Sequence, residues 1–145
     1  MELIVDTNRI VASLIKDGIS RKIILSSRFT LHSPEFGVAE VSKYRGMIME
    51  KTHLDEGKFN TLMKMLLSKI IVYSEKEFSG KSLERAEKLM GKIDKDDVLF
   101  AALSFELKGT PIWSDDLHFR KQEKIRIYTT KELSGLFEQD RAADG

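Results

Sequence analysis

Apolar residues along this chain form short continuous runs, separated by longer segments with helical periodicity. Short apolar runs bounded by polar residues are typical of buried strands. We expect strands at Leu3–Val5, Phe29–Leu31, Ile70–Tyr73, Pro111–Ser114 and Ile125–Tyr128. Between them, apolar residues recur every three or four positions, which predicts helices over Asn8–Ile15, Ser20–Ser27, Pro34–Met47, Phe59–Leu67, Ser82–Met90, Val98–Leu107 and Thr129–Phe137. This alternation predicts an α/β protein, a three-layer α/β/α sandwich with a mainly parallel central sheet.

Capping residues support several of these boundaries. The turn before the third predicted helix ends in Pro34, which suits the first turn of a helix. Thr129 and Glu132 have the spacing of a capping box for the last helix. The length of 145 residues suits one domain, which we expect over residues 1–138, followed by a polar, frayed tail over residues 139–145.

The composition excludes several classes of protein. With 41% hydrophobic and 32% charged residues, the chain can bury a core and still present a solvated surface. The absence of cysteine excludes a disulfide scaffold, a thiolate zinc site and a cysteine nucleophile. No apolar run approaches the roughly 18 residues of a membrane-spanning helix, and no charged-then-apolar leader is present. We therefore expect a cytoplasmic protein with no membrane attachment.

Four acidic residues each adjoin an apolar element. Asp6 and Asp116 follow predicted strands directly. Glu40 interrupts an apolar helix, and Asp97 precedes one. These four are too far apart in sequence for a single calcium loop, whose ligands lie within about 12 residues, so they would have to converge in the folded chain. Three further acids flank them: Asp94, Asp96 and Asp115.

A parallel sheet gives a reason for such convergence, because sites in these folds form at the carboxyl ends of strands beside a topological switch point. Each acid alone also has a structural explanation, as a helix N-terminal acid, a turn residue or a solvated helix residue. Gathered in a partly desolvated pocket, however, carboxylates repel one another unless a cation joins them. Oxygen ligands without cysteine suit Mg²⁺ or Mn²⁺, and such ions can activate water for attack on a phosphodiester.

Four segments carry a family resemblance: Val5–Asn8, Ala39–Val41, Asp96–Leu103 and Ile112–Phe119. In their order, their spacing and the total chain length, they resemble the four motifs of PIN-domain ribonucleases. That family includes the VapC-like toxins of prokaryotic toxin–antitoxin systems. The resemblance covers nearly the whole chain and implies a PIN fold with a metal-dependent endoribonuclease site. By it, the acids that bind one or two Mg²⁺ or Mn²⁺ ions and carry catalysis would be Asp6, Glu40, Asp97 and Asp116.

The resemblance also implies auxiliary residues. Ser114 matches a Thr/Ser two residues before the last acid, a hydroxyl that can hydrogen-bond water or a carboxylate. Asn8 matches a polar residue two positions after the first acid. Asp97 and Asp116 are preferred within their doubled pairs, but that choice stays open. The neighbouring acids that could assist the site are Asp94, Asp96 and Asp115.

Basic residues close in sequence to these acids are candidates for RNA phosphate contacts: Arg9, Lys43 and Arg45. His118 could contact a metal or a phosphate, but beside Phe119 we interpret it as a surface or packing residue. The net charge is only +1, from 24 basic and 23 acidic residues. With the seven suspected pocket acids set aside, 16 acids remain against 24 bases, so the rest of the molecule could tolerate an RNA backbone.

Two functions stay open at this point. The first is hydrolysis of RNA, with the protein as a toxin that has an antitoxin partner and forms a homodimer, as is common in the family. The second is a PIN-like binding module of an RNA-processing assembly, without strong catalysis of its own. Apolar residues in Ile19–Leu25 and Met47–Met49 offer a surface for a partner. A phosphorylatable receiver-like domain fits less well, because it needs an acidic pair after the first strand and this chain has Asp6 alone there.

Overall fold

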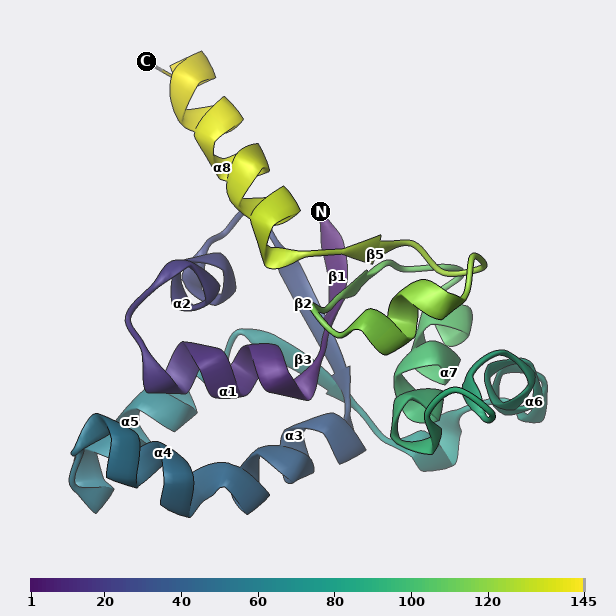
Figure 1. Cartoon of the computed structure of the whole chain (residues 1–145), viewed down its shortest axis with the longest axis horizontal. Coiled ribbons are helices and arrows are strands. Elements are labelled where there is room, and N and C mark those ends of the chain that lie inside the picture. The colour runs from purple at the N-terminus through teal and green to yellow at the C-terminus, as the bar shows by residue number, and fades with distance from the viewer. Residues whose placement is uncertain (145) are drawn as a thin grey trace.

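The computed structural model describes residues 1–144, with the side chains of residues 1–139. At its centre lies a five-stranded sheet in the order β3-β2-β1-β4-β5, in which every neighbouring pair of strands is parallel (Figure 1). The strands are β1 (Glu2–Val5), β2 (Thr30–Pro34), β3 (Ile70–Tyr73), β4 (Ile112–Trp113) and β5 (Ile127–Tyr128). The predicted parallel sheet is confirmed.

The middle strand, β1, pairs on both sides. The register places Leu3 opposite Leu31 of β2, and Val5 opposite Trp113 of β4. The chain runs from β1 to β2 and β3 on one side, and then returns to add β4 and β5 on the other side. The connections therefore diverge between β1 and β4, and sites in parallel sheets form at the carboxyl ends of strands at such a point.

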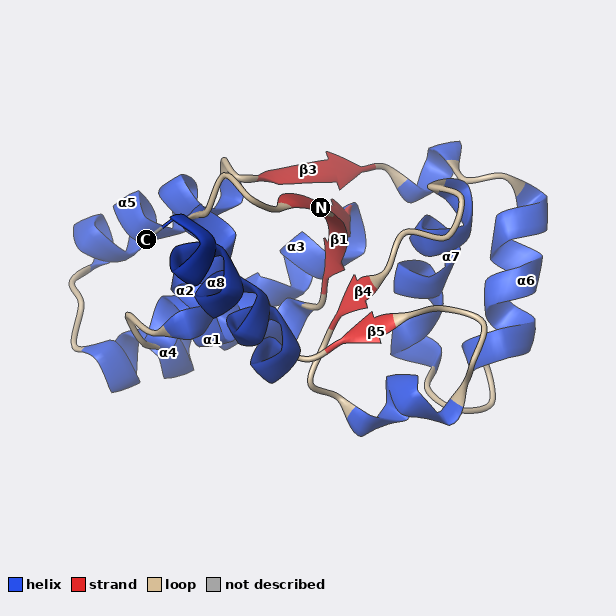
Figure 2. Ribbon diagram, turned by 90° about the horizontal axis from the view of Figure 1, so that it is seen from above, coloured by secondary structure: helices blue, strands red, loops and turns tan. Residues whose placement is uncertain are grey.

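Helices cover both faces of this sheet, which confirms the three-layer arrangement (Figure 2). One layer contains α1 (Thr7–Ile15), α2 (Ile19–Leu25), α4 (Arg45–Thr52), α5 (Glu56–Leu67) and α8 (Thr130–Asp144), and the other contains α6 (Gly80–Met90) and α7 (Val98–Glu106). Side chains of β1 alternate between the two cores: Leu3 and Val5 pack in the first, and Ile4 in the second. All three are fully buried, so the central strand is held by apolar packing from both sides.

The predicted helix from Pro34 to Met47 begins later than expected and is interrupted. Strand β2 continues through Pro34, which pairs with Tyr73 of β3. The backbone of Pro34 is extended (φ −68°, ψ 152°), and a proline also holds the residue before it out of the helical region. The chain then forms α3 (Glu35–Val41), the 3₁₀ turn η1 (Ser42–Tyr44) and α4.

Three further 3₁₀ turns connect the remaining elements: η2 (Glu75–Glu77), η3 (Lys95–Asp97) and η4 (Leu117–Lys121). The sequence predicted a helix start near η3, but no helical turn at η4, which follows β4. Both η3 and η4 lie in segments that carry predicted site acids.

The last helix begins at the predicted capping box. Thr129 N donates to Glu132 Oε1, and Glu132 N donates to Thr129 Oγ1, both at 3.1 Å. Helix α8 continues to Asp144, beyond the predicted end at Phe137, and Gly145 of the predicted tail lies outside the described residues. The division between a domain over residues 1–138 and a tail stays a prediction. Within residues 1–144, no helix combines the length and the apolar composition needed to cross a membrane.

A close contact places α3 against the carboxyl edge of the sheet. A Cβ atom on Gly37 would lie 2.7 Å from Ser33 Oγ and 2.8 Å from the ring of Phe100. Thr7 Oγ1, at the start of α1, donates to Gly37 O at 3.0 Å. Glycine therefore allows α3 to approach β2 and α7, and this approach fixes the position of Glu40 near the end of α3.

Candidate metal centre

Asp6 stands at the end of β1, at the N-cap position of α1. It is only 5% exposed, and Ser114 Oγ donates to its Oδ2 at 2.7 Å. The same Ser114 oxygen accepts from Asp116 N at 3.0 Å, so one hydroxyl links the ends of β1 and β4. Burial raises the pKa of Asp6, and the hydrogen bond from Ser114 offsets part of that rise.

Asp97 ends η3 and immediately precedes α7. It is 6% exposed, and its Oδ2 has no hydrogen-bond partner among the residues that the structure describes. Burial raises the pKa of Asp97 to about 8, and the negative charges of Asp94, Asp6 and Asp116 add to the rise. This carboxyl group therefore lies among other acids in a position that disfavours its charged form.

Four side chains that could bind a metal ion lie close together: two acids of the η3 segment and two residues from the loop after β4. One ligand atom from each lies within 4.8 Å of the others, in the group Asp94, Asp97, Asp116 and His118. His118 Nδ1 lies 3.0 Å from Asp94 Oδ2 and 3.6 Å from Asp116 Oδ1. Asp116 Oδ1 also accepts from His118 N at 2.9 Å, which holds the start of η4.

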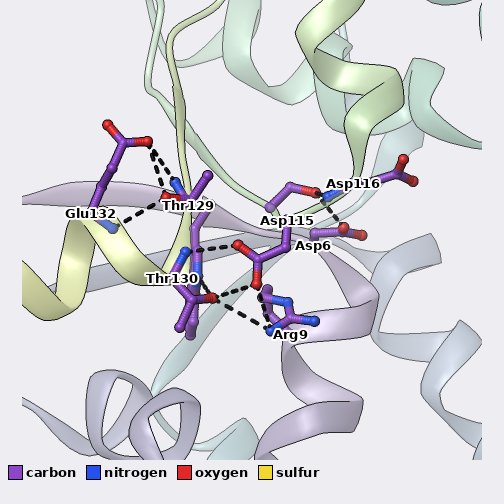
Figure 3. A network of polar contacts seen from close by, with 9 residues as sticks. Asp6, Arg9, Asp115, Asp116, Thr129, Thr130 and Glu132 are labelled. Atoms are coloured by element: carbon purple, nitrogen blue, oxygen red, sulfur yellow. Dashed lines mark hydrogen bonds and ion pairs between the residues drawn. The ribbon is translucent and has the colours of Figure 1, made fainter.

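The two adjacent acids after β4, Asp115 and Asp116, make different contacts (Figure 3). Asp115 turns away from the acid cluster: its Oδ2 lies 2.9 Å from Arg9 Nη1 and accepts from Thr130 Oγ1 at 2.7 Å. Its Oδ1 accepts from Thr130 N at 2.8 Å. Asp115 thus joins α1 to the start of α8, while Asp116 lies beside Asp97.

The doubled pair before α7 is divided in a similar way. Asp96 is exposed, whereas Asp97 is buried. Asp94 Oδ1 accepts from Asp96 N at 3.0 Å as the cap of η3, and its other oxygen faces His118. Asp94 therefore caps the turn and also belongs to the group of ligand atoms, and its auxiliary role in the site stays a prediction.

Asp6, Glu40 and Asn8 lie outside the close group of four, although the charge of Asp6 adds to the raised pKa of Asp97. Glu40 is 19% exposed on α3, and its nearest charged partner among the described residues is Lys43, at 3.7 Å. Asn8 is exposed in the first turn of α1. The resemblance remains the reason to include Glu40 and Asn8 in the site.

The three predicted RNA-contact residues differ in their exposure and in the contacts that they already make. Arg9 is bound to Asp115, and Arg45 lies 3.1 Å from Glu56 and 4.6 Å over the ring of Phe59. Lys43 is 71% exposed. Of the three, Lys43 is therefore the one most available to an incoming phosphate.

Sequence reasoning set His118 aside as a surface or packing residue, but the structure places its ring at the acid cluster. Its neighbour Phe119 is the side chain that packs, at 1% exposure. The sequence does contain a feature that indicates this position: His118 lies two residues after Asp116, and an Asp at a turn accepts a hydrogen bond from the backbone N–H two residues later. That turn aims the imidazole back toward the acids.

The donor set of this centre fits a divalent cation. Three carboxylates and an imidazole present ligand atoms within 4.8 Å of one another, and the buried Asp97 Oδ2 has no hydrogen-bond partner in the part of the chain that the structure describes. Oxygen-rich sites of this kind suit Mg²⁺ and Mn²⁺. A cation would also remove the mutual repulsion of the acids.

Comparisons with known proteins agree with the fold and identify the family. The family model of the PIN domain matches residues 4–134, so the chain belongs to the PIN domain family. A chain of the crystal structure of VapBC2 from Rickettsia felis, bound to a DNA fragment from their promoter, is similar with a TM-score of 0.66 and 14% identity. That match covers 89% of this chain and 98% of the other, and it supports the fold. A search of curated proteins gave no match.

Proposed function

We propose that this protein is a metal-dependent endoribonuclease that hydrolyses RNA phosphodiester bonds, with one or two Mg²⁺ or Mn²⁺ ions as cofactor. The observation that carries the proposal is Asp97, a buried carboxyl group among other acids, one oxygen of which has no hydrogen-bond partner among the described residues. A carboxylate in that position needs a cation to be stable in its charged form. By the resemblance, the ions would be held by Asp6, Glu40, Asp97 and Asp116, of which Asp97 and Asp116 belong to the group of ligand atoms within 4.8 Å of one another.

The chain's own residues keep this centre preorganised. Ser114 orients Asp6 through the 2.7 Å hydrogen bond and fixes the turn that carries Asp116. When bound, the divalent ion supplies positive charge that lowers the pKa of a water molecule and stabilises the leaving oxygen of the phosphodiester. No side chain needs to act as the nucleophile, which suits a chain that contains no cysteine.

The biological role we propose is that of a toxin, located in the cytoplasm and paired with an antitoxin protein. Membership of the PIN domain family and the similarity to a VapBC2 structure support this role. The predicted partner surface at Ile19–Leu25 lies on α2, where Ile19 and Leu25 line an apolar groove together with Phe137 of α8. Homodimer formation, which the resemblance implies, is part of the same proposal.

The test is cleavage of end-labelled RNA by the purified protein with Mn²⁺ or Mg²⁺, compared with EDTA. Asp97→Asn removes the charge at the centre and is expected to lower the cleavage rate by about 100-fold or more. Asp17→Asn is the matched control, because its side chain is 79% exposed, and it should cut at the parent rate. Cleavage that persists in EDTA, or equal rates for Asp97→Asn and the parent, would contradict the proposal. RNA binding without any cutting would favour the binding-module alternative instead.

A further inference from the structure

The loop after β4 brings a nitrogen donor to a cluster of carboxylates. His118 Nδ1 lies 3.0 Å from Asp94 Oδ2 and 3.6 Å from Asp116 Oδ1. Two ligand atoms at adjacent positions on a cation, each about 2.1 Å from it, are themselves about 3 Å apart. At 3.0 Å, His118 Nδ1 and Asp94 Oδ2 have the spacing of neighbouring ligands around one ion, which is also the spacing of the hydrogen bond between them, and the 3.6 Å to Asp116 Oδ1 is wider.

The imidazole is held in this place by the fold. The backbone N of His118 donates to Asp116 Oδ1 at 2.9 Å, and the next residue, Phe119, is buried in the core against α7. The side chain of His118 remains 46% exposed. The ring is thus anchored on one side and open to solvent on the other, where a bound ion could keep water ligands.

A second observation points independently to a ligand at this place. Asp97 is 94% buried, and its Oδ2 has no hydrogen-bond partner among the described residues. Asp97 belongs to the same group of ligand atoms within 4.8 Å. A buried polar oxygen without a donor is costly, and a cation bound between Asp97 and His118 would supply its missing partner.

We infer that His118 is a metal ligand through Nδ1, alongside Asp94, Asp97 and Asp116, and that it makes the centre prefer Mn²⁺ over Mg²⁺. Mn²⁺ and Mg²⁺ both accept carboxylate and water ligands, but Mn²⁺ is a first-row transition ion that accepts an imidazole nitrogen more readily than Mg²⁺, which selects oxygen ligands and retains its waters. A site made of carboxylates alone would discriminate less between the two ions. The inference rests on the proposed metal-dependent function and names the ion that this chain's residues favour.

The direct test is pulsed electron paramagnetic resonance of the Mn²⁺-loaded protein. A nitrogen bound to Mn²⁺ gives a ¹⁴N hyperfine coupling, which we expect in the parent protein and not in His118→Asn. Asparagine places an oxygen at the position of Nδ1, so it exchanges the donor element and keeps a short polar side chain. His53→Asn is the matched control, because His53 is exposed in the left-handed conformation (φ 56°) that asparagine tolerates, and it should retain the coupling.

The second readout is the ratio of Mn²⁺ to Mg²⁺ affinity, measured by calorimetry on the same variants. His118→Asn should lose about tenfold in Mn²⁺ affinity and change little in Mg²⁺ affinity, so the ratio falls. Circular dichroism of His118→Asn should match that of the parent. An unchanged ratio would overturn the inference, even if the coupling was not resolved.

The outcomes separate this inference from the proposed function. Mn²⁺ that binds through Asp97 without a ¹⁴N coupling would overturn the role of His118 and leave the nuclease proposal intact. A ¹⁴N coupling in a protein that cuts no RNA would support His118 as a ligand and contradict the nuclease. A parent protein that binds no Mn²⁺ would overturn both.

Discussion

At the scale of single residues, the protein places carboxyl groups where their charged forms are disfavoured. Asp97 is the strongest case, since burial comes first among the causes of its raised pKa and the neighbouring acids follow. Such an arrangement lowers the stability of the metal-free protein, and functional sites commonly carry this cost. The fold has to offset this cost through its cores and its hydrogen bonds, and a bound cation would remove part of it.

Asp97→Asn should therefore stabilise the metal-free protein at neutral and alkaline pH. The pKa of Asp97 is about 8 in the folded chain and near 3.8 in the unfolded chain, so between these values the folded state holds the extra proton. The contribution of Asp97 to stability is full below about pH 4 and is lost as the pH rises to about 8, with a slope of at most about 1.4 kcal/mol per pH unit. Urea unfolding in EDTA at several pH values should show that the free energy of unfolding falls less with rising pH in Asp97→Asn than in the parent.

Asp17→Asn serves as the control for this series, since its exposed side chain should leave the parent pH profile unchanged. Parallel profiles for the parent and Asp97→Asn would show that Asp97 does not titrate in this window.

Ser114→Ala should reduce catalysis with little effect on the rest of the fold. The change removes the hydroxyl that donates to Asp6 and accepts from Asp116 N, so both acids lose a support. Loss of a hydrogen bond that orients a metal ligand costs about 10-fold to 100-fold in affinity or activity. Ser13→Ala is a matched control, because Ser13 is also buried but donates to Ile10 O within α1. RNA cleavage with Mn²⁺ at parent rates in Ser114→Ala would remove this residue from the mechanism.

At the scale of elements, the site depends on where two segments, the loop after β4 and helix α3, are held beside the carboxyl ends of β1 and β4. The loop after β4 is tied to α1 and α8 through Asp115, Arg9 and Thr130 (Figure 3). Helix α3 is tied to α1 through Thr7 and Gly37. The acids are therefore positioned by backbone segments that are braced at some distance from the centre.

Gly37→Ala should destabilise the protein and lower its activity. The new Cβ would lie 2.7 Å from Ser33 Oγ and 2.8 Å from the Phe100 ring, so α3 must move, and Glu40 with it. Overpacking of this kind costs about 1–3 kcal/mol. Gly46→Ala in α4 is the matched control, since its Cβ would meet nothing within 4 Å and alanine gains up to about 1 kcal/mol in a helix.

Thermal unfolding of the two variants checks this prediction. A melting temperature for Gly37→Ala equal to that of Gly46→Ala would show that α3 does not need the close approach.

The elements themselves were largely predictable from sequence, and the exceptions have physical causes. Alternation of short apolar runs with helical periods identified the parallel sheet, and the Thr129–Glu132 spacing marked the start of α8. Pro34 misled the prediction because proline suits both the end of an extended strand and the start of a helix. The turn η4 was missed because Asp116 forms it locally, without an apolar period.

At the scale of the whole molecule, the parallel topology determines which acids meet. The proximity of Asp6 and Asp116 could be predicted, because both residues follow strands whose carboxyl ends lie side by side. The burial of Asp97 could be anticipated from the apolar helix that follows it. The contact of His118 with the cluster and the distance of Glu40 from it depend on how η4 turns and where α3 packs, which one sequence does not specify.

The effect of the charges also depends on how the whole molecule distributes them. The net charge of +1 includes a local concentration of acids at one edge of the sheet. A divalent cation would neutralise part of this edge and let a phosphate backbone approach it. Cation binding is therefore the step on which the account depends most.

That step can be measured directly by isothermal titration calorimetry with Mn²⁺, without knowledge of the RNA target. The account predicts saturable binding of one or two ions to the parent protein, and at least about tenfold weaker binding to Asp97→Asn. Asp17→Asn should bind like the parent. Absence of binding to the parent, or equal affinity for the parent and Asp97→Asn, would contradict the claim that this acidic cluster is a metal centre.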